Sequence, residues 1–541
     1  MKRTTCRICA AAFAAVALLI SAASCCNNKA DEGQLLQIGD DIAIAQTQYG
    51  KIQGYIYDNV YHFLGVPYGA STAGENRFMP PVAPEPWNGV LRTICYGDSA
   101  PQGPANFDTQ NWGTFRDHWN YGLITEDCLK LNVWTPALDA KKRPVIVWLH
   151  GGGYAYGNGV EQDGYTGGNF AKTQDAVFCS VNHRLNCFGY TDFASVGGEK
   201  YKHSGNVGML DIIAALQWVH DNIAQFGGDP DNVTIIGQSG GGAKVCTIAA
   251  MPAAKGLVHK AVALSGNCTS ASNKEAAEAL GEAILAEAGL KPSEIDKLQQ
   301  MPWEEYSALA NRASRKLAQS GIRAGFSPVS DGLDIPVNFY EAGRTDIPDV
   351  PMIICSTANE FVSSVTSPEL EKNTREDIIK MIQARYPENA EAIYDEYAKL
   401  FPNDSPYGIW SVISSSRDGV FRTATTKLQQ KSPVYVAWFR WYPNLMNGRM
   451  RAFHCLDICF WFNNTDLMYT HTGGSREARV LSSKMAASLA EFMRTGDPNG
   501  AKGGLPTWGQ FTPEGGETMV LDDVPAFGPA PDAKARELMK R

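Results

Sequence analysis

The residues best suited to covalent chemistry are a serine and its flanking glycines, which read Gly-Gln-Ser-Gly-Gly at residues 237–241. An apolar, β-branched run at 233–236 precedes them, and a segment at 241–250 with helical character follows. In a tight turn between a strand and a helix, a serine projects its hydroxyl outward, and glycines let the chain pack closely around it. The spacing predicts that Ser239 is a nucleophile; the alternative is a glycine-rich turn without a chemical role.

A second glycine-rich segment, His-Gly-Gly-Gly at residues 150–153, follows an apolar run at 145–149. Transition states of acyl transfer develop a negatively charged oxygen, and glycines allow backbone N–H groups to face that oxygen. We expect the oxyanion donors to be Gly152 and Gly153, together with Gly240 beside the serine. The alternative is a flexible turn. The two motifs together predict acyl transfer through a serine.

The rest of the chain predicts an α/β fold that would position these motifs. Continuous apolar runs indicate strands that are buried on both faces, and therefore a large, mostly parallel central sheet with helices on both faces. Two mainly helical stretches, about 291–320 and 363–430, lack strand patterns and are interpreted as insertions that cap the sheet. The expected strands lie at 145–148, 176–178, 233–236, 260–264, 352–354 and 434–439, and the clearest helical patterns lie at 211–226 and 272–290.

Composition excludes several classes of protein. The 541 residues are 44% hydrophobic and 19% charged, so the chain can bury a large core and is not disordered. Its 48 basic and 57 acidic residues give a formal charge of -9, which offers no electrostatic footprint for nucleic acid. The 13 cysteines are too sparse for a disulfide scaffold and lack the paired C-x-x-C spacings of a zinc site. We expect no nucleic-acid partner and no metal.

The first residues have the pattern of an export signal. Lys2 and Arg3 precede an apolar run at 10–20, which is about half of the ~20 residues that a membrane-spanning helix needs. Small residues follow and end at Cys25, as in a bacterial lipoprotein signal in which that cysteine is acylated. We expect an exported lipoprotein that contacts the membrane of the cell envelope only through this lipid. The alternative is ordinary cleavage near Ala23, which would give a periplasmic or secreted protein.

Further segments of the chain match the signatures of one known family. They are Phe-Leu-Gly-Val-Pro-Tyr at 63–68, Arg-Phe at 77–78, Glu-Asp-Cys-Leu at 126–129, Gly-Asn-Val-Gly-Met-Leu-Asp at 205–211, Ala-Leu-Gln-Trp-Val at 215–219, Phe-Gly-Gly-Asp-Pro at 226–230 and Thr-Gly-Asp-Pro-Asn at 495–499. With the two glycine motifs, the chain resembles the type-B carboxylesterase and cholinesterase family of α/β-hydrolases over about residues 43–525. The resemblance implies one catalytic domain at 43–541 and no cofactor. The export pattern places a signal peptide at 1–24 and a tether at 25–42 before this domain.

The resemblance also places two more catalytic side chains. Ser-Thr-Ala-Asn-Glu at 356–360 is similar to the family's G-T-x-x-D-E-G, which makes Glu360 the acid that orients an imidazole. Ala-Phe-His at 452–454 is similar to the family's G-A-x-H, which makes His454 the general base and then the general acid. The order Ser239, Glu360, His454 is the order of α/β-hydrolases. The other eight histidines are interpreted as structural.

The chain departs from the family pattern at several positions near these motifs. Gln238 stands where the family usually has glutamate, and Gly240 stands where it has alanine. Ser356, Phe361 and Arg451 each replace a glycine that is common in the family. We expect these changes to alter the shape of the pocket more than the chemistry.

Two further expectations follow from the resemblance. The family's disulfide to Cys128 lacks its usual partner, because residues 100–102 read Ala-Pro-Gln, and the nearest alternative partner is Cys95. Trp119 lies near the place of a choline-binding tryptophan in the cholinesterase branch. Because Gln238 removes a negative charge that would hold a cation, we expect Trp119 and Gln238 to line a pocket for small neutral esters; the alternative is that Trp119 only packs within the fold.

The resemblance leaves three classes of function open. The first is a serine esterase that forms an acyl-enzyme, which water then hydrolyses. A cholinesterase-like enzyme, a lipase or a glycan-deacetylating esterase would share this mechanism and differ in substrate. A catalytically silent adhesion relative normally lacks a triad residue, whereas all three are present here. The sequence therefore favours a carboxylic ester hydrolase, and it leaves the oligomeric state open.

Overall fold

The computed structural model describes residues 34–103, 120 and 122–540. The expected signal peptide, Cys25 and Trp119 lie outside these residues. No helix within the described ranges is long and apolar enough to cross a membrane.

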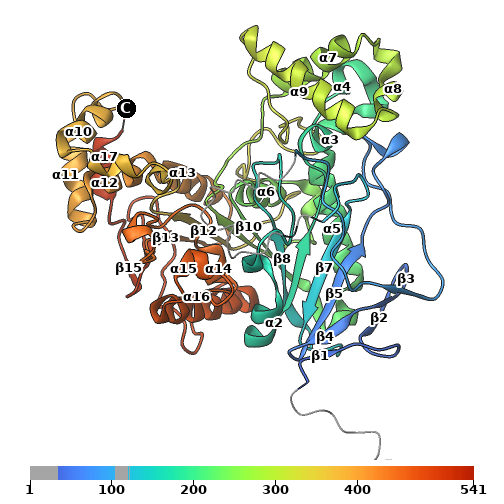
Figure 1. The fold of residues 1–541 in the computed structure, drawn as a ribbon, viewed down its shortest axis with the longest axis horizontal. Coiled ribbons are helices and arrows are strands. Elements are labelled where there is room, and N and C mark those ends of the chain that lie inside the picture. The colour runs from blue at the N-terminus through green and yellow to red at the C-terminus, as the bar shows by residue number, and fades with distance from the viewer. Residues whose placement is uncertain (1–33, 104–119, 121, 541) are drawn as a thin grey trace, which may run out of the picture.

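A large central sheet organises the described part of the chain (Figure 1). Its seven central strands, from β9 to β14, pair in parallel, and antiparallel strands flank them at both ends. The predicted mostly parallel sheet is confirmed. In spatial order the strands are β1 (Leu36–Gln37), β4 (Tyr55–Tyr57), β5 (Val60–Pro67), β7 (Lys130–Thr135), β9 (Val177–Val181), β8 (Arg143–Leu149), β10 (Gly228–Gln238), β11 (Lys260–Leu264), β12 (Met352–Thr357), β13 (Val434–Phe439), β14 (Thr518–Leu521) and β15 (Ala526–Gly528); a smaller sheet holds β2 (Ile44–Thr47), β3 (Gly50–Gln53) and β6 (Val90–Arg92).

Hydrophobic cores lie on both faces of the central sheet, because side chains alternate along each strand. In β8, Ile146 and Trp148 belong to one core, whereas Val145, Val147 and Leu149 belong to the other. Helices cover both faces, as the continuous apolar strands predicted. The first core includes residues of α2 (Gly168–Gln174) and α16 (Arg476–Thr495), and the second includes residues of α5 (Val207–Asn222), α6 (Gly240–Ile248) and α13 (Asp418–Lys427).

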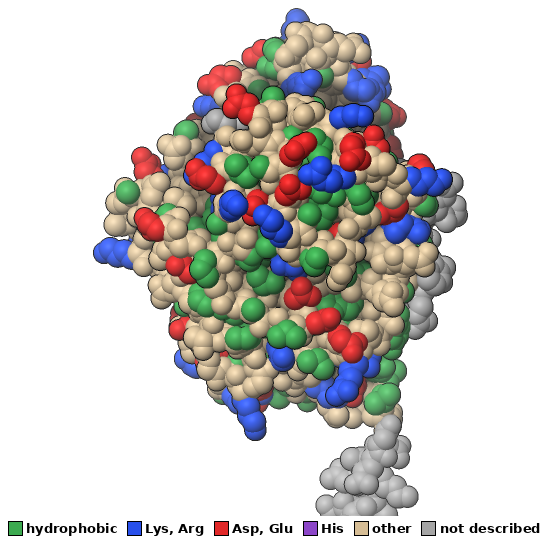
Figure 2. All heavy atoms as spheres, turned by 90° about the vertical axis from the view of Figure 1, so that its left-hand side faces the viewer, with side chains coloured by type: hydrophobic (Ala, Val, Ile, Leu, Met, Phe, Trp, Pro, Cys, Tyr) green, Lys and Arg blue, Asp and Glu red, His purple; other side chains and the backbone are tan. Residues whose placement is uncertain are grey.

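The two predicted insertions are helical and extend beyond the sheet (Figure 1). The first packs with α7 in a third hydrophobic cluster, so the helix expected at 272–290 covers another helix and not the sheet. The second insertion ends in α13, which packs on the sheet, while its other helices pack together with α17. On that side of the molecule, acidic and basic side chains are interspersed (Figure 2). These helices are α7 (Lys274–Ala288), α8 (Ile295–Gln299), α9 (Trp303–Gln319), α10 (Arg375–Gln383), α11 (Ala390–Leu400), α12 (Pro406–Ser414) and α17 (Ala533–Leu538); shorter ones are α3 (Asn186–Gly189), α4 (Ala194–Gly197), α14 (Ile458–Trp461) and α15 (Tyr469–Thr472).

The expected disulfide between Cys95 and Cys128 is wrong, since both are free thiols, one exposed and one buried. The register around β5 explains why. Cys95 follows a residue that pairs with Leu64, whereas Cys128 lies two residues before the partner of Pro67 in an antiparallel strand. The cysteines therefore lie beside positions four residues apart along β5 and its continuation, which corresponds to roughly 13 Å, and a disulfide needs Cα atoms within about 7 Å.

Candidate active site

Ser239 lies between β10 and α6 in a strained turn, as the sequence predicts. Its φ of 58° and ψ of −123° fall in a region that residues with a side chain rarely adopt. The backbone N–H of Ser239 donates to Leu264 O at 2.8 Å and ties the turn to β11. A Cβ on Gly237 would lie 2.3 Å from Gly241 O, so this position requires glycine. The turn places Ser239 at the carboxyl end of the parallel strands, where open α/β sheets bind ligands.

The predicted oxyanion loop meets the first turn of α6. Gly152 and Gly153 adopt positive φ values of 83° and 57°. A Cβ on Gly240 would lie only 2.6 Å from Gly153 N, so the close approach of the loop explains why glycine replaces the family's alanine. A Cβ on Gly151 would lie 3.4 Å from the Cβ of Ser239. The glycines predicted as oxyanion donors thus lie together beside the serine.

Glu360 and His454 form the expected pair. His454 Nδ1 lies 2.5 Å from Glu360 Oε2, and the other carboxylate oxygen accepts a hydrogen bond from Thr357 N at 3.0 Å. The backbone N–H of Glu360 donates to Ser415 Oγ at 2.8 Å, so the acid is held at its backbone and its side chain. Burial lowers the pKa of His454, but Cys455 and Glu360 outweigh that effect and hold the pKa above its usual value. An imidazole bound at Nδ1 keeps Nε2 for proton transfer.

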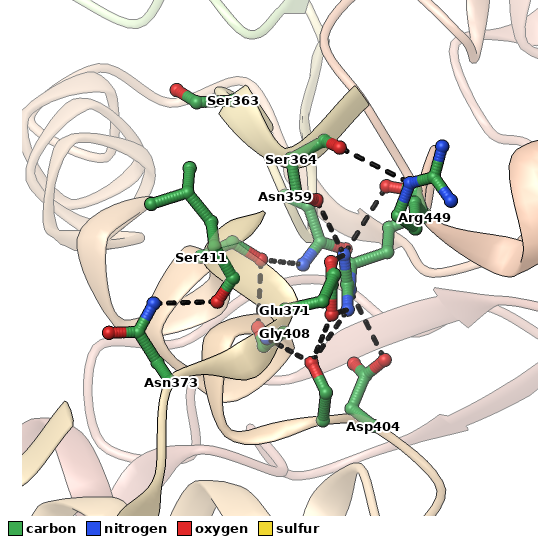
Figure 3. Close-up of polar contacts among 12 residues, drawn as sticks. Asn359, Ser363, Ser364, Glu371, Asn373, Asp404, Gly408, Ser411 and Arg449 are labelled. Carbon is green, nitrogen blue, oxygen red and sulfur yellow. Dashed lines mark hydrogen bonds and ion pairs between the residues drawn. The ribbon is translucent and has the colours of Figure 1, made fainter. Parts of the chain in front are cut away.

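The loops that carry this pair are joined one residue before Glu360. Asn359 N donates to Ala452 O at 3.0 Å, and Ala452 N donates to Asn359 Oδ1 at 3.3 Å. The Asn359 amide also donates to Ser411 Oγ of α12 at 2.6 Å (Figure 3). The distance between the acid and the base is therefore set by a pairing of backbones as well as by their own side chains.

Arg451 attaches the same loop to the second insertion. Its φ of 52° lies in the left-handed region, which fits the glycine that the family has there. The buried guanidinium donates to both carboxylate oxygens of Glu371, at 2.8 and 3.0 Å, and to Asp404 Oδ1 at 3.3 Å. Figure 3 shows these carboxylates with Ser364, whose hydroxyl accepts a further hydrogen bond at 3.2 Å. The departure at Arg451 thus gives the loop that carries His454 an anchor in the insertion.

Gln238 lies against the imidazole and does not line an open pocket as expected. The side chain is 1% exposed, and its Nε2 is 3.3 Å from both ring nitrogens of His454. The Cys455 thiol donates to Gln238 Oε1 at 3.1 Å. Among the described residues, Ser239 Oγ makes no hydrogen bond to His454, although the residue next to Ser239 contacts the ring. Such catalytic hydrogen bonds often form only once substrate binds.

A buried group of ionisable side chains was not predicted. Lys244 of α6 is fully buried, and its Nζ donates to His150 O at 2.9 Å and lies 5.6 Å from the ring centroid of Tyr154. Burial lowers the pKa of Lys244 to about 7 and raises that of Glu161 to about 7. The His150 ring stacks on His183 at 5.0 Å. A lysine five residues after the serine, in a segment of glycine and apolar residues, is the sequence signal that could have indicated this group.

Comparison with known proteins agrees with this geometry. The model of the carboxylesterase family matches residues 41–536. The chain is 30% identical to a para-nitrobenzyl esterase of Bacillus subtilis, over 91% of this chain and 98% of the relative. It is 31% identical to a phenmedipham hydrolase of Pseudarthrobacter oxydans, over 89% of this chain and 95% of the relative.

Solved structures show the same similarity. An esterase of Clostridium hathewayi that hydrolyses aliphatic aromatic polyesters superposes with a TM-score of 0.81 at 31% identity, over 93% of this chain and 98% of that chain. A carboxylesterase of Geobacillus stearothermophilus superposes with a TM-score of 0.75 at 32% identity, over 92% of this chain and all of that chain. The chain therefore belongs to the carboxylesterase family, and it is a carboxylic ester hydrolase with the α/β-hydrolase fold.

Proposed function

We propose that Ser239, His454 and Glu360 are the catalytic residues of this esterase. The observation that supports this most directly is the 2.5 Å contact between His454 Nδ1 and Glu360 Oε2, beside the strained turn of Ser239. The Ser239 oxygen attacks the ester carbonyl carbon while His454 Nε2 takes the hydroxyl proton. The tetrahedral oxyanion is then stabilised by backbone N–H groups of the glycines 152, 153 and 240.

Collapse of this intermediate breaks the bond to the alcohol. His454 gives its proton to the departing oxygen, and the acyl group stays on Ser239. Water then loses a proton to the same imidazole and attacks the acyl carbon. The second tetrahedral intermediate collapses by breaking the bond to Ser239, His454 returns the proton to the serine oxygen, and the acid is released. The Glu360 carboxylate stabilises the imidazolium in both halves of the reaction.

We also propose that the substrates are small neutral esters. An uncharged amide at Gln238 replaces a carboxylate that would help to hold a quaternary ammonium group. The relatives are named for p-nitrobenzyl esters, phenmedipham and aliphatic aromatic polyesters, and these names support neutral substrates for this chain. A cholinesterase, a lipase and a glycan-deacetylating esterase remain the alternatives in substrate.

A panel of esters that varies acyl length and alcohol charge tests both proposals. Purified enzyme should hydrolyse short neutral esters with a higher kcat/KM than a choline ester of the same acid. A phosphonylating reagent should label Ser239 stoichiometrically. Ser239→Ala should lower kcat by about 10⁴-fold or more with the fold intact, as judged by circular dichroism. Activity above a tenth of wild type in this variant would remove Ser239 from the mechanism, and a tenfold preference for the choline ester would support the cholinesterase alternative.

For the N-terminal region, we propose that residues 1–24 are removed and that Cys25 carries the lipid anchor. The charged residues, apolar run and small residues before this cysteine support the proposal. Mass spectrometry of the native N-terminus should find acylated Cys25, and Cys25→Ser should release the protein from membranes. An unmodified N-terminus at Ser24 would contradict it.

A further inference from the structure

Phe361 is an exposed aromatic side chain directly beside the base. It follows Glu360, at a position where the family commonly has glycine. The side chain is 74% exposed, and its ring stacks on the His454 imidazole with a centroid distance of 5.4 Å and an interplanar angle of 25°. Among the described residues most large apolar side chains are buried, so an exposed ring stacked on the proposed base stands apart from the rest.

The position of the Phe361 ring relates it to the alcohol side of the ester substrate. Because Glu360 occupies Nδ1 of His454, proton transfer uses Nε2. That nitrogen must come within hydrogen-bond distance of the departing alcohol oxygen. The substituent on this oxygen therefore extends next to the imidazole, and the exposed ring of Phe361 lies beside the same imidazole.

A second exposed aromatic lies beside the expected oxyanion loop. Tyr156 is 63% exposed, and its N–H donates to Gly152 O at 3.2 Å. A Cβ on Gly152 would lie 3.1 Å from Tyr156 Cδ2, so this ring lies beside the expected oxyanion loop. Tyr156 is thus associated with the carbonyl oxygen, and Phe361 is associated with the alcohol oxygen.

We propose that Phe361 is a specificity-determining residue that favours esters of aromatic alcohols. The inference rests on the proposed role of His454 as the acid that protonates the leaving group. An aromatic leaving group can form an offset-stacked or edge-on pair with the Phe361 ring, whereas a saturated ring of similar size offers only apolar surface. Such a pair corresponds to a preference of roughly two- to twelvefold.

Matched ester pairs test the proposal. Benzyl acetate and cyclohexylmethyl acetate differ on the alcohol side, and methyl phenylacetate and methyl cyclohexylacetate differ on the acid side. Wild type should show a kcat/KM ratio above about two for the first pair. Phe361→Leu keeps apolar volume but removes the π face, and it should bring that ratio close to one. Phe361→Tyr should retain the ratio, and the acid-side ratio should not change in either variant.

A control variant separates this effect from a general loss of aromatic surface. Tyr57 of β4 is 47% exposed and packs edge-on to the histidine at position 62 at 6.1 Å, so Tyr57→Leu removes an exposed aromatic beside a different histidine. It should keep the wild-type ratio. Equal rates for benzyl and cyclohexylmethyl acetate in wild type, or an unchanged ratio in Phe361→Leu, would overturn the proposal. Failure of wild type to hydrolyse any of the four esters would instead overturn the proposed function.

Discussion

Lys244 Nζ donates a 2.9 Å hydrogen bond to His150 O, which joins the helix after Ser239 to the loop that carries Gly152 and Gly153. Gly240 lies in the first turn of that helix. The expected oxyanion donors come from these two segments, so this bond helps to fix the position of Gly240 relative to Gly152 and Gly153. Since misplacement by about 1 Å can cost about 10²-fold in rate, we propose that this bond supports transition-state stabilisation by the expected donors.

We expect Lys244→Met to lower kcat by about tenfold or more with little change in KM, because its effect is on donors that act in the transition state. A trifluoromethyl ketone mimics the tetrahedral state. The value of kcat from steady-state kinetics and the affinity for this inhibitor should decrease together. Lys427→Met is the matched control. That lysine is the last residue of α13, is equally buried, lies 5.6 Å from a tyrosine ring centroid and donates to Gln430 Oε1 at 2.6 Å. It should lower stability and leave kcat unchanged; equal losses of kcat in both variants would contradict the role of Lys244.

The pH dependence should report His454. Only the neutral imidazole accepts the serine proton, so kcat/KM should rise with pH and reach a plateau. Because Glu360 and Cys455 hold the pKa of His454 above its usual value, the midpoint should lie above about 6.5. Glu360→Gln removes the carboxylate, and it should lower both the midpoint and kcat. A rate that does not change between pH 5 and 8, or a midpoint that stays in place in Glu360→Gln, would exclude this assignment.

Arg451→Gly should separate backbone strain from ion pairing. Glycine suits the φ of 52°, but the change leaves Glu371 and Asp404 without their buried partner. We expect a net loss of about 2 to 4 kcal/mol in the free energy of unfolding, measured with urea. In Arg451→Gly/Glu371→Gln the loss should be smaller, because the uncompensated charge is gone. No loss of stability in the single variant would show that the network contributes little.

The ion pair between Arg451 and Glu371 predicts that the stability of the fold decreases in acid. Burial raises the pKa of Glu371, but hydrogen bonds from Arg451 and nearby serines outweigh it and lower the pKa to about 2. A carboxyl whose pKa is lower in the folded state stabilises the fold above its unfolded pKa of about 4.3, and that contribution is lost as the pH falls towards about 2. Urea unfolding between pH 2 and 6 should show a smaller acid-dependent loss in Glu371→Gln than in wild type. An equal loss in both proteins would exclude this group as a source of the acid dependence.

The thiols at positions 95 and 128 should differ in reactivity. Cys95 is exposed, so maleimide should label it in the native protein, whereas Cys128 is buried, and burial raises its pKa. Cys128 should react only after unfolding. Peptide mapping under non-reducing conditions checks both statements, and a Cys95–Cys128 crosslinked peptide would restore the disulfide that the structure excludes.

The sequence by itself determined the features that depend on neighbours along the chain. The turn at Ser239 could be predicted because its strand, its glycines and its helix are contiguous, and the elbow was found as expected. Continuous apolar strands predicted a sheet buried on both faces for the same reason. Glu360 and His454 were placed by resemblance to a family, since no local pattern joins residues that are 94 positions apart.

Only the tertiary structure decided which distant side chains meet. The register of β5 separates Cys95 from Cys128, although both flank the same strand. Lys244 is buried where its helix contacts the loop at 150–153, and Phe361 is exposed with its ring stacked on the imidazole. Each of these outcomes depends on how separate segments pack. A pattern with a period of a few residues carries information about one element's own faces and not about the distance to another element.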